Sequence, residues 1–200
     1  MVQAIAVVLI VLAVPAAAGG ATAVEARLAE RSLGDPAAPV TLVEYSSLTC
    51  PHCATFHTET LPKIKEAYID TGLVRLVYQD YPLDAVAMAA ALVARCVDPS
   101  RYFGFLDVLY RDQAKWSTVG RPLDNLKQLG RLAGLSDAAF AACLDDATLL
   151  QGVQSRAAQA RQDRAITSTP TFYVNDQKIV GAQGFEAFRS VIDAEIAKAR

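Results

Sequence analysis

Thr49-Cys50-Pro51-His52-Cys53 is the stretch from which the rest of the fold can be predicted. The apolar and β-branched residues 40–45 precede it, and such a run is typical of a strand. Residues 54–71 follow it, and their apolar side chains recur at helical spacing until Gly72. The two cysteines therefore lie where a strand passes into a helix, and Cys50 is expected at the helix N-terminus.

This position favours redox chemistry at the cysteine pair. Backbone N–H groups and the positive end of the helix dipole stabilise a thiolate, so we expect a low pKa for Cys50 and attack by its sulfur. Pro51 suits the first helical position, where an N–H has no partner within the helix. Cys53 lies one turn along, near enough to close a disulfide with Cys50. His52, if it is cationic or donates a hydrogen bond, makes that disulfide more oxidising, which favours an oxidase over a reductase.

Residues 1–23 are predicted to be a secretory signal peptide. They hold no charged side chain, and the apolar run at residues 4–14 is followed by Pro15 and by small residues typical of a cleavage site. No Lys or Arg precedes the run, which a natural start upstream of Met1 would explain. An uncleaved membrane anchor is the alternative, but the run is too short and too interrupted to span a bilayer comfortably. We therefore expect export to the periplasm.

Composition limits the classes of function. The chain has 200 residues, 52% of them hydrophobic, and a net charge of −2, so it can bury one core and gives no case for nucleic-acid binding. Its four cysteines suit an oxidising compartment. Cys96 and Cys143 each lie in an apolar helical segment, where they could be two separate buried thiols. In an exported chain with an even cysteine count we expect them to form a structural disulfide, worth about 2 to 4 kcal/mol.

Two segments resemble the DsbA-type thiol:disulfide oxidoreductases of the thioredoxin superfamily. Residues 44–53 are similar to the active-site segment of that family, and Ser168-Thr169-Pro170-Thr171-Phe172 is similar to its cis-proline loop. The resemblance extends over residues 35–200. It implies a cis Pro170 and a Thr169 that faces the cysteine pair and holds an extended client peptide. It also implies reduced client proteins or peptides as substrates and a DsbB-like membrane protein as reoxidant, and we expect a monomer that needs no cofactor.

The order of the predicted elements agrees with this resemblance. It is that of an α/β thioredoxin-like fold, βαβ followed by ββα, interrupted by an all-helical insertion. Residues 24–83 are expected to form the first half with the cysteine pair, residues 84–165 the insertion, and residues 166–200 the second half with the cis-proline loop.

Within the first half, residues 24–31 are expected to be a short mobile lead. Pro62 should kink the first helix, and residues 73–79 should form a strand parallel to the first. Asp84 is expected to cap the first helix of the insertion. The remaining predicted elements are helices at residues 85–97, 100–116, 121–133, 136–144, 147–164 and 185–198, and a hairpin of strands at residues 171–175 and 178–180.

Two residues near the cysteines leave alternatives open. By resemblance, Glu44 is the acid beneath the active site that assists proton transfer around Cys53; otherwise it is a strand-edge carboxylate that faces solvent. His57 shares a helix face with Cys53. The side chains of Cys50, Cys53, His52 and His57 suit zinc chemically, but their spacing is poor for a tetrahedral shell, so no metal site is expected.

The sequence therefore predicts an exported dithiol oxidase that donates the Cys50–Cys53 disulfide to newly translocated proteins. A disulfide isomerase or reductase is the nearest alternative, and such a protein normally adds a dimerisation module or uses a less oxidising dipeptide. A metal-binding or chaperone-like periplasmic protein is the alternative from another class. It would use the groove beside Pro170 without net redox turnover.

Overall fold

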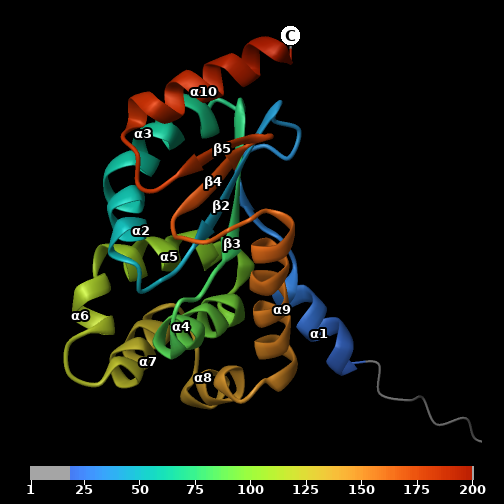
Figure 1. Ribbon diagram of the computed structural model, residues 1–200. Coiled ribbons are helices and arrows are strands. Elements are labelled where there is room, and N and C mark those ends of the chain that lie inside the picture. The colour runs from blue at the N-terminus through green and yellow to red at the C-terminus, as the bar shows by residue number, and fades with distance from the viewer. Residues whose placement is uncertain (1–18, 200) are drawn as a thin grey trace, which may run out of the picture.

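The computed structural model describes residues 19–199. Helices surround a central five-stranded sheet, and a helical region extends from one end of it (Figure 1). The strand order is β1-β3-β2-β4-β5, with bounds Arg31–Leu33 (β1), Val40–Ser46 (β2), Val74–Asp80 (β3), Thr171–Val174 (β4) and Gln177–Val180 (β5). β2 and β3 are parallel, as predicted, and the other neighbouring pairs are antiparallel. Residues 1–18 of the predicted signal peptide lie outside the described residues.

One long helical segment connects β2 to β3. Its four consecutive parts are α2 (Pro51–Thr55), η1 (Phe56–Thr60), α3 (Leu61–Ile64) and η2 (Lys65–Ile69). The two η parts are π-helical, so the N–H of Leu61 bonds the carbonyl of Phe56, five residues back. Pro62 was expected to kink the helix; in the structure, the helix instead has a wider, π-helical turn just before the proline. An α-helical turn would press the proline ring against the carbonyl four residues back, and the wider turn relieves that clash.

The residues between β3 and β4 form the predicted helical insertion. Its elements are α4 (Ala85–Cys96), η3 (Pro99–Arg101), α5 (Tyr102–Arg111), α6 (Gln113–Ser117), α7 (Pro122–Leu132), α8 (Asp137–Leu144) and α9 (Ala147–Asp163). Asp84 caps α4 as predicted, because its Oδ1 accepts the N–H of Ala87 at 2.7 Å. Within residues 19–199, no helix has both the length and the apolar character needed to cross a bilayer.

The single helix expected at residues 100–116 is wrong, because η3, α5 and α6 occupy that segment. The chain leaves the helical conformation at Asp112 (φ −102°, ψ 18°). The indole of Trp116 then donates to the carbonyl of Leu109 at 2.7 Å, and the side chain of Gln113 donates to the loop before the cysteines. These hydrogen bonds stabilise the break between α5 and α6. The periodicity of apolar residues does not predict them, so it does not predict the break.

The mobile lead expected at residues 24–31 is also wrong. Gly19–Leu28 is helix α1, and β1 follows it and adds an antiparallel strand beside β3. The buried guanidinium of Arg95 holds this segment, because its Nη1 donates to the carbonyls of Arg27 and Ala29 at 2.9 and 3.2 Å. A three-residue strand is too short for a periodic pattern to reveal it.

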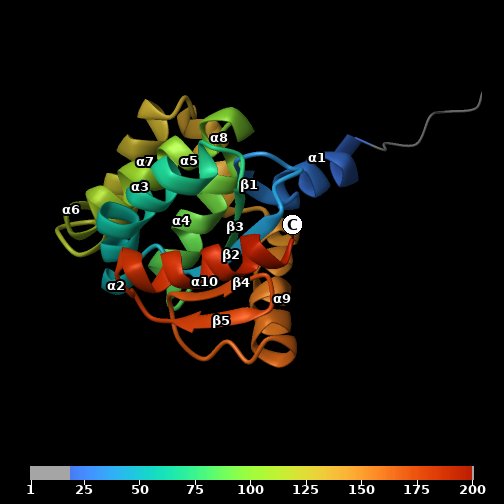
Figure 2. The same cartoon turned by 90° about the horizontal axis from the view of Figure 1, so that it is seen from above.

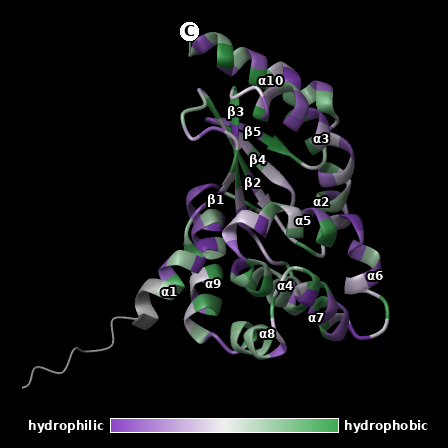
Figure 3. Ribbon diagram, turned by 180° about the vertical axis from the view of Figure 1, so that it is seen from behind, coloured by the Kyte–Doolittle hydropathy of each residue, from purple (hydrophilic) through white to green (hydrophobic). Residues whose placement is uncertain are grey.

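Two large apolar clusters hold the sheet and the helices together. One packs α3 and α10 (Phe185–Lys198) against the sheet, and Figure 2 shows α10 lying across β4 and β2. In Figure 3, α10 alternates between hydrophobic and hydrophilic residues, as expected of a helix that covers a sheet. The other cluster joins the insertion to the first half, because Cys50 and Cys53 pack with aromatic side chains of α5 and with Trp116.

Candidate active site

Two cysteines begin α2. Cys50 is the N-cap residue, in an extended conformation (φ −79°, ψ 118°), and Pro51 takes the first helical position. The N–H groups of Cys53 and Ala54 both donate to the carbonyl of Cys50, at 3.1 and 3.2 Å. Both thiols are free; Cys50 is 6% exposed, and Cys53 is completely buried. The structure thus places Cys50 at a helix N-terminus, with Cys53 behind it in the core.

The surroundings give the two thiols opposite tendencies to ionise. A side-chain hydrogen bond with Cys53 is the main cause that lowers the pKa of Cys50 to about 5, against the opposing effect of burial. Thr169 and the backbone N–H groups of Cys53 and His52 lower it further. Burial raises the pKa of Cys53, and its hydrogen bond with Cys50 raises it more. At neutral pH the reduced pair therefore carries a thiolate on Cys50 and a thiol on Cys53.

His52 contributes to the low pKa of Cys50 through its backbone N–H group, and a role for its imidazole stays a prediction. Its side chain is exposed, and its effect on the pKa of Cys50 comes from its N–H group. The reason is the position of Cys50 as N-cap, which directs the first N–H groups of α2 toward the sulfur.

The second landmark lies against the cysteines. The Thr169–Pro170 peptide bond is cis, and the thiol of Cys50 donates to the carbonyl oxygen of Thr169 at 3.4 Å. The pairing of strands brings Thr169 close to Cys50. β4 begins directly after Pro170 and pairs with β2, and the chain runs from the end of β2 to Cys50. Two segments about 120 residues apart in the sequence therefore form one site.

Glu44 does not face solvent at a strand edge, so that alternative is wrong. β2 lies between β3 and β4 in the sheet, and Glu44 is completely buried. Its Oε1 accepts a hydrogen bond from the hydroxyl of Ser46 at 2.6 Å and lies 3.0 Å from Nε2 of His57. The imidazole of His57 also stacks on the ring of Tyr110, with the ring centroids 3.9 Å apart. Glu44 thus belongs to a buried polar cluster.

Sequence reasoning does not identify three members of this cluster, Ser46, Tyr78 and Tyr110. The side chain of Ser46 partly opposes the rise in the pKa of Cys53. The hydroxyl oxygen of Tyr110 lies 2.6 Å from that of Tyr78, and burial raises the pKa of Tyr110 while Ser46 lowers it. The alternation of β2 is the signal that could have found Ser46, because it lies two residues from Glu44 and so on the same face. Tyr110 comes from the insertion, and no local pattern links it to Cys53.

The insertion also holds the loop before the cysteines. The side-chain amide of Gln113 donates to the carbonyls of Leu48 and Cys50 at 2.9 and 3.0 Å. Thr49 donates to the carboxylate of Asp84 at 2.6 Å, and Asp84 is the cap of α4. Two helices of the insertion therefore fix the backbone that orients Cys50.

The two histidines have different surroundings. His52 is exposed, whereas His57 is buried against Glu44 and Tyr110. Among residues 19–199, no three His, Cys, Asp or Glu side chains are grouped so that they could hold a metal ion.

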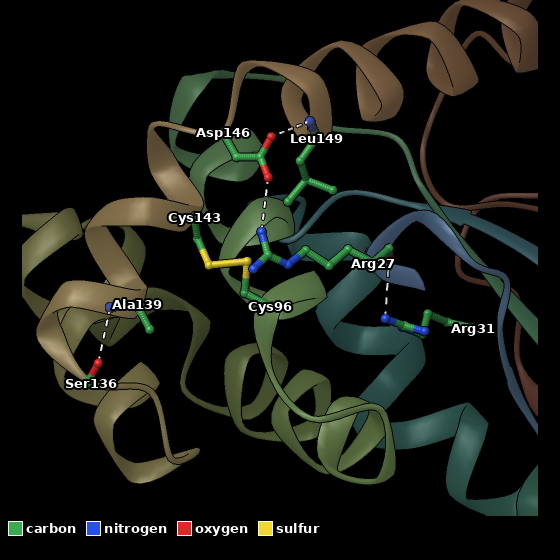
Figure 4. The surroundings of a disulfide bond; sticks show 8 residues. All are labelled: Arg27, Arg31, Cys96, Ser136, Ala139, Cys143, Asp146 and Leu149. Carbon is green, nitrogen blue, oxygen red and sulfur yellow. Dashed lines mark hydrogen bonds and ion pairs between the residues drawn. A yellow bond between two sulfur atoms is a disulfide. The ribbon is translucent and has the colours of Figure 1, made fainter. Parts of the chain in front are cut away.

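A disulfide joins Cys96 and Cys143, with an S–S distance of 2.05 Å. It links the last residue of α4 to α8, and Figure 4 shows an ion pair beside it. In that pair, Arg27 of α1 lies 3.0 Å from Asp146, which caps α9. The disulfide therefore lies where four helices meet, and Cys96 packs in a different apolar cluster from the Cys50–Cys53 pair.

Comparison with known proteins identifies the family. The family model described as thioredoxin matches residues 27–194, which is most of the chain. This chain belongs to the thioredoxin family. Within it the chain is DsbA-like, since the crystal structure of Wolbachia pipientis alpha-DsbA1 is 32% identical to it, with a TM-score of 0.79. That match covers 85% of this chain and 92% of the Wolbachia protein. The thioredoxin-like fold with a helical insertion between β3 and β4 is thereby confirmed.

Two further proteins, one a solved structure and one a curated relative, are similar to this chain. BdbD from Bacillus subtilis, in its oxidised form, is 26% identical with a TM-score of 0.76, and the match covers 84% of this chain and 93% of BdbD. A putative protein-disulfide oxidoreductase of Rickettsia bellii is 30% identical over 144 residues. That alignment covers 72% of this chain and 56% of the Rickettsia protein, so the chain spans little more than half the length of that relative.

Proposed function

We propose that this chain is a protein-disulfide oxidase that donates its Cys50–Cys53 disulfide to pairs of reduced client cysteines. The observation that carries the proposal is the unequal ionisation of the two thiols, with the pKa of Cys50 at about 5 and that of Cys53 raised by burial. A stabilised thiolate stabilises the reduced protein, so the disulfide becomes a stronger oxidant. The name of a 28% identical Bacillus subtilis relative, disulfide bond formation protein D, supports the same direction.

The proposed reaction begins when a client thiolate attacks Sγ of Cys50. The new client–Cys50 bond forms as the Cys50–Cys53 bond breaks, and Cys53 leaves and takes up a proton. A second client thiolate then attacks the client sulfur of this mixed disulfide, and Cys50 leaves as a thiolate. Two electrons thus pass from the client dithiol to the protein. The low pKa of Cys50 favours the second step, because a thiol of low pKa is the better leaving group.

The loop at Pro170 is proposed to hold the client. Because the carbonyl of Thr169 lies 3.4 Å from Sγ of Cys50, an extended client peptide bound along Thr169 would bring its own cysteine beside Cys50. Glu44 is proposed to assist proton transfer at Cys53, since it is buried and accepts a hydrogen bond from Ser46, the side chain that lowers the pKa of Cys53.

The proposed place of work is the periplasm. The leader predicted at residues 1–23 supports export, and a disulfide between Cys96 and Cys143 suits an oxidising compartment. A DsbB-like membrane protein is the proposed reoxidant. We propose a monomer that works without a cofactor or a metal.

The redox equilibrium of Cys50–Cys53 with glutathione tests the direction of the reaction. The purified chain is equilibrated with glutathione buffers, and thiol labelling follows this pair separately from Cys96 and Cys143. We expect a reduction potential well above that of thioredoxin. A potential as low as that of thioredoxin would contradict the oxidase and would favour a reductase.

Replacement of Cys53 separates catalysis from simple binding. In the variant C53S, an oxidase is expected to lose turnover or to accumulate mixed disulfides between Cys50 and client cysteines. A chaperone-like protein would keep its activity in an assay of client aggregation, because binding beside Pro170 does not need Cys53.

A further inference from the structure

Three exposed cations lie close to the cis-proline loop. Arg161 belongs to the last turn of α9, Arg164 directly follows that helix, and Lys178 lies on β5. Within residues 19–199, none of the three forms an ion pair with a carboxylate. We call Arg161, Arg164 and Lys178 the basic cluster. Its charge stands out because the chain as a whole has a net charge of −2.

Neutral groups hold two of these cations close together. The guanidinium carbon of Arg164 lies 5.1 Å from the ring centroid of Tyr173, and Nζ of Lys178 lies 5.8 Å from the same centroid. Nζ of Lys178 also donates to the carbonyl of Ala165 at 2.9 Å. An aromatic face and a carbonyl oxygen attract a cation without cancelling its charge. Like charges held this close repel each other, so an anion bound between them would be stabilised.

The third cation is connected to both loops of the active site. Nε of Arg161 donates to the hydroxyl of Tyr81 at 3.1 Å, and that hydroxyl donates to the carbonyl of Ile166 at 2.9 Å. Ile166 lies in the loop that leads to the cis proline. The N–H of Tyr81 donates to the carbonyl of Ser46 at 2.7 Å, at the end of the strand that leads to Cys50. The basic cluster is therefore continuous with the redox site.

Two surface hollows of about 380 Å³ each flank the C-terminal half of α9. The charged residues that line them are Arg161 in one hollow and Glu30, Arg156, Asp163 and Arg164 in the other. Glu30 is already paired with Arg75 at 2.8 Å. Each hollow therefore presents more positive than free negative charge, which suits an acidic side chain.

The basic cluster lies within reach of a client peptide at the redox site. The carbonyl of Thr169 is 3.4 Å from Sγ of Cys50, and Arg164 precedes Thr169 by five residues. An extended chain spans at most about 3.6 Å per residue, so the Cα atoms of Arg164 and Thr169 are no more than about 18 Å apart. A client bound along Thr169 thus carries residues about three to five positions from its reacting cysteine toward the basic cluster.

We propose that the basic cluster selects clients with Asp or Glu about three to five residues from the reacting cysteine. This inference rests on the disulfide exchange proposed above and names the class of substrate that the site prefers. The exchange itself is unchanged: the client dithiol still gives two electrons to the Cys50–Cys53 disulfide. The basic cluster attracts the acidic segment and orients it, so that the client cysteine meets Cys50 more often.

Two synthetic peptides test this preference. Both contain the same pair of cysteines, and residues three to five positions from the first cysteine, on either side, are Glu in one peptide and Gln in the other. Trp116 is the single tryptophan of the chain and packs in the same apolar cluster as Cys50 and Cys53, so its fluorescence is used to follow their reduction in stopped flow. Reaction of each peptide with dithiodipyridine corrects for intrinsic reactivity, because nearby carboxylates raise the pKa of a thiol.

We expect the oxidised protein to react about tenfold faster with the Glu peptide at low ionic strength, after this correction. That factor is at the lower end of the gains seen for electrostatic steering. The ratio of the two rates should fall toward one in 1 M NaCl, where the Debye length is only about 3 Å. The sign of the effect is diagnostic, because the net charge of the chain alone would disfavour the acidic peptide.

Variants assign the preference to the basic cluster. In R164Q/K178Q the ratio should fall at least threefold while the rate with the Gln peptide stays unchanged, as expected if the cis-proline loop remains folded. R164K/K178R keeps both charges and should keep the ratio. The matched control K63Q/R189Q removes two charges from exposed positions on α3 and α10. It should leave the ratio as in wild type.

Three results would overturn the proposal. They are a corrected ratio of one or less in wild type, an unchanged ratio in R164Q/K178Q, and an equal fall of the ratio in K63Q/R189Q. If the cysteine pair proves to be a reductant, the same ratio is measured with the reduced protein and the oxidised peptides. A low reduction potential against glutathione would therefore contradict the oxidase alone, and the absence of a preference for Glu would contradict the basic cluster alone.

Discussion

At the scale of single residues, the low pKa of Cys50 makes the stability of the reduced protein depend on pH. An unperturbed cysteine has a pKa of about 8.5, and folding lowers the pKa of Cys50 to about 5. Because the folded value is the lower one, the stabilisation is complete above the unfolded value and is lost as the pH falls through the folded one. The free energy of unfolding should therefore rise with pH in this window, by at most about 1.4 kcal/mol per pH unit. Urea unfolding of the reduced protein at a series of pH values measures it.

The variant C50S is the control for this prediction. It lacks the thiolate, so its free energy of unfolding should vary less with pH over the same window. The oxidised protein should resemble it, because its Cys50 cannot ionise. Parallel curves for reduced wild type and C50S would contradict the stabilised thiolate.

The residues of the site differ in how far the sequence could predict them. Cys50 and Pro170 belong to short local motifs, and the structure brings them together through the pairing of β2 with β4. The sequence alone does not show whether Glu44 is buried, because the burial of a strand residue depends on which strands flank it. For His57, the partner of Glu44, the sequence suggests only a possible role as a metal ligand. Local sequence periodicity predicts neither the π-helical turn that contains His57 nor its contact with Tyr110 of the insertion.

At the scale of elements, α6 is coupled to the active-site loop through one side chain. The variant Q113L keeps the approximate size of Gln113 but removes its hydrogen bonds to the buried carbonyls of Leu48 and Cys50. We expect the free energy of unfolding to fall by about 1 to 3 kcal/mol, the usual cost of an unsatisfied buried polar group. We also expect slower alkylation of Cys50 near pH 6, because its backbone is no longer held. Chemical denaturation and iodoacetamide kinetics measure the two effects.

The same substitution in the neighbouring helix provides a matched control. Gln128 lies on α7 and is exposed, so Q128L should change the free energy of unfolding by about 0.5 kcal/mol or less and leave Cys50 alkylation unchanged. Equal losses in Q113L and Q128L would show that the effect comes from an added leucine and not from the lost hydrogen bonds.

Elements that have their own start and stop signals were predicted well. The cap at Asp84 marked α4, and the hairpin of β4 and β5 and the C-terminal helix α10 follow local periodicity. The breaks around α5 and the short β1 could not be predicted in this way. They are stabilised by distant partners, such as the carbonyl of Leu48 for Gln113 and the guanidinium of Arg95 for the segment before β1.

At the scale of the whole molecule, the Cys96–Cys143 disulfide should stabilise the fold without setting the chemistry. It joins α4 to α8 across 47 residues. Its removal should increase the conformational entropy of the unfolded chain and so lower the free energy of unfolding by about 2 to 4 kcal/mol. The glutathione equilibrium of Cys50–Cys53 should not change in C96A/C143A, because the groups that lower the pKa of Cys50 come from α2 and Thr169. Unfolding curves of the variant and wild type, both with Cys50–Cys53 oxidised, measure the first effect. An unchanged stability, or a shifted glutathione equilibrium, would contradict this separation of the structural disulfide from the redox pair.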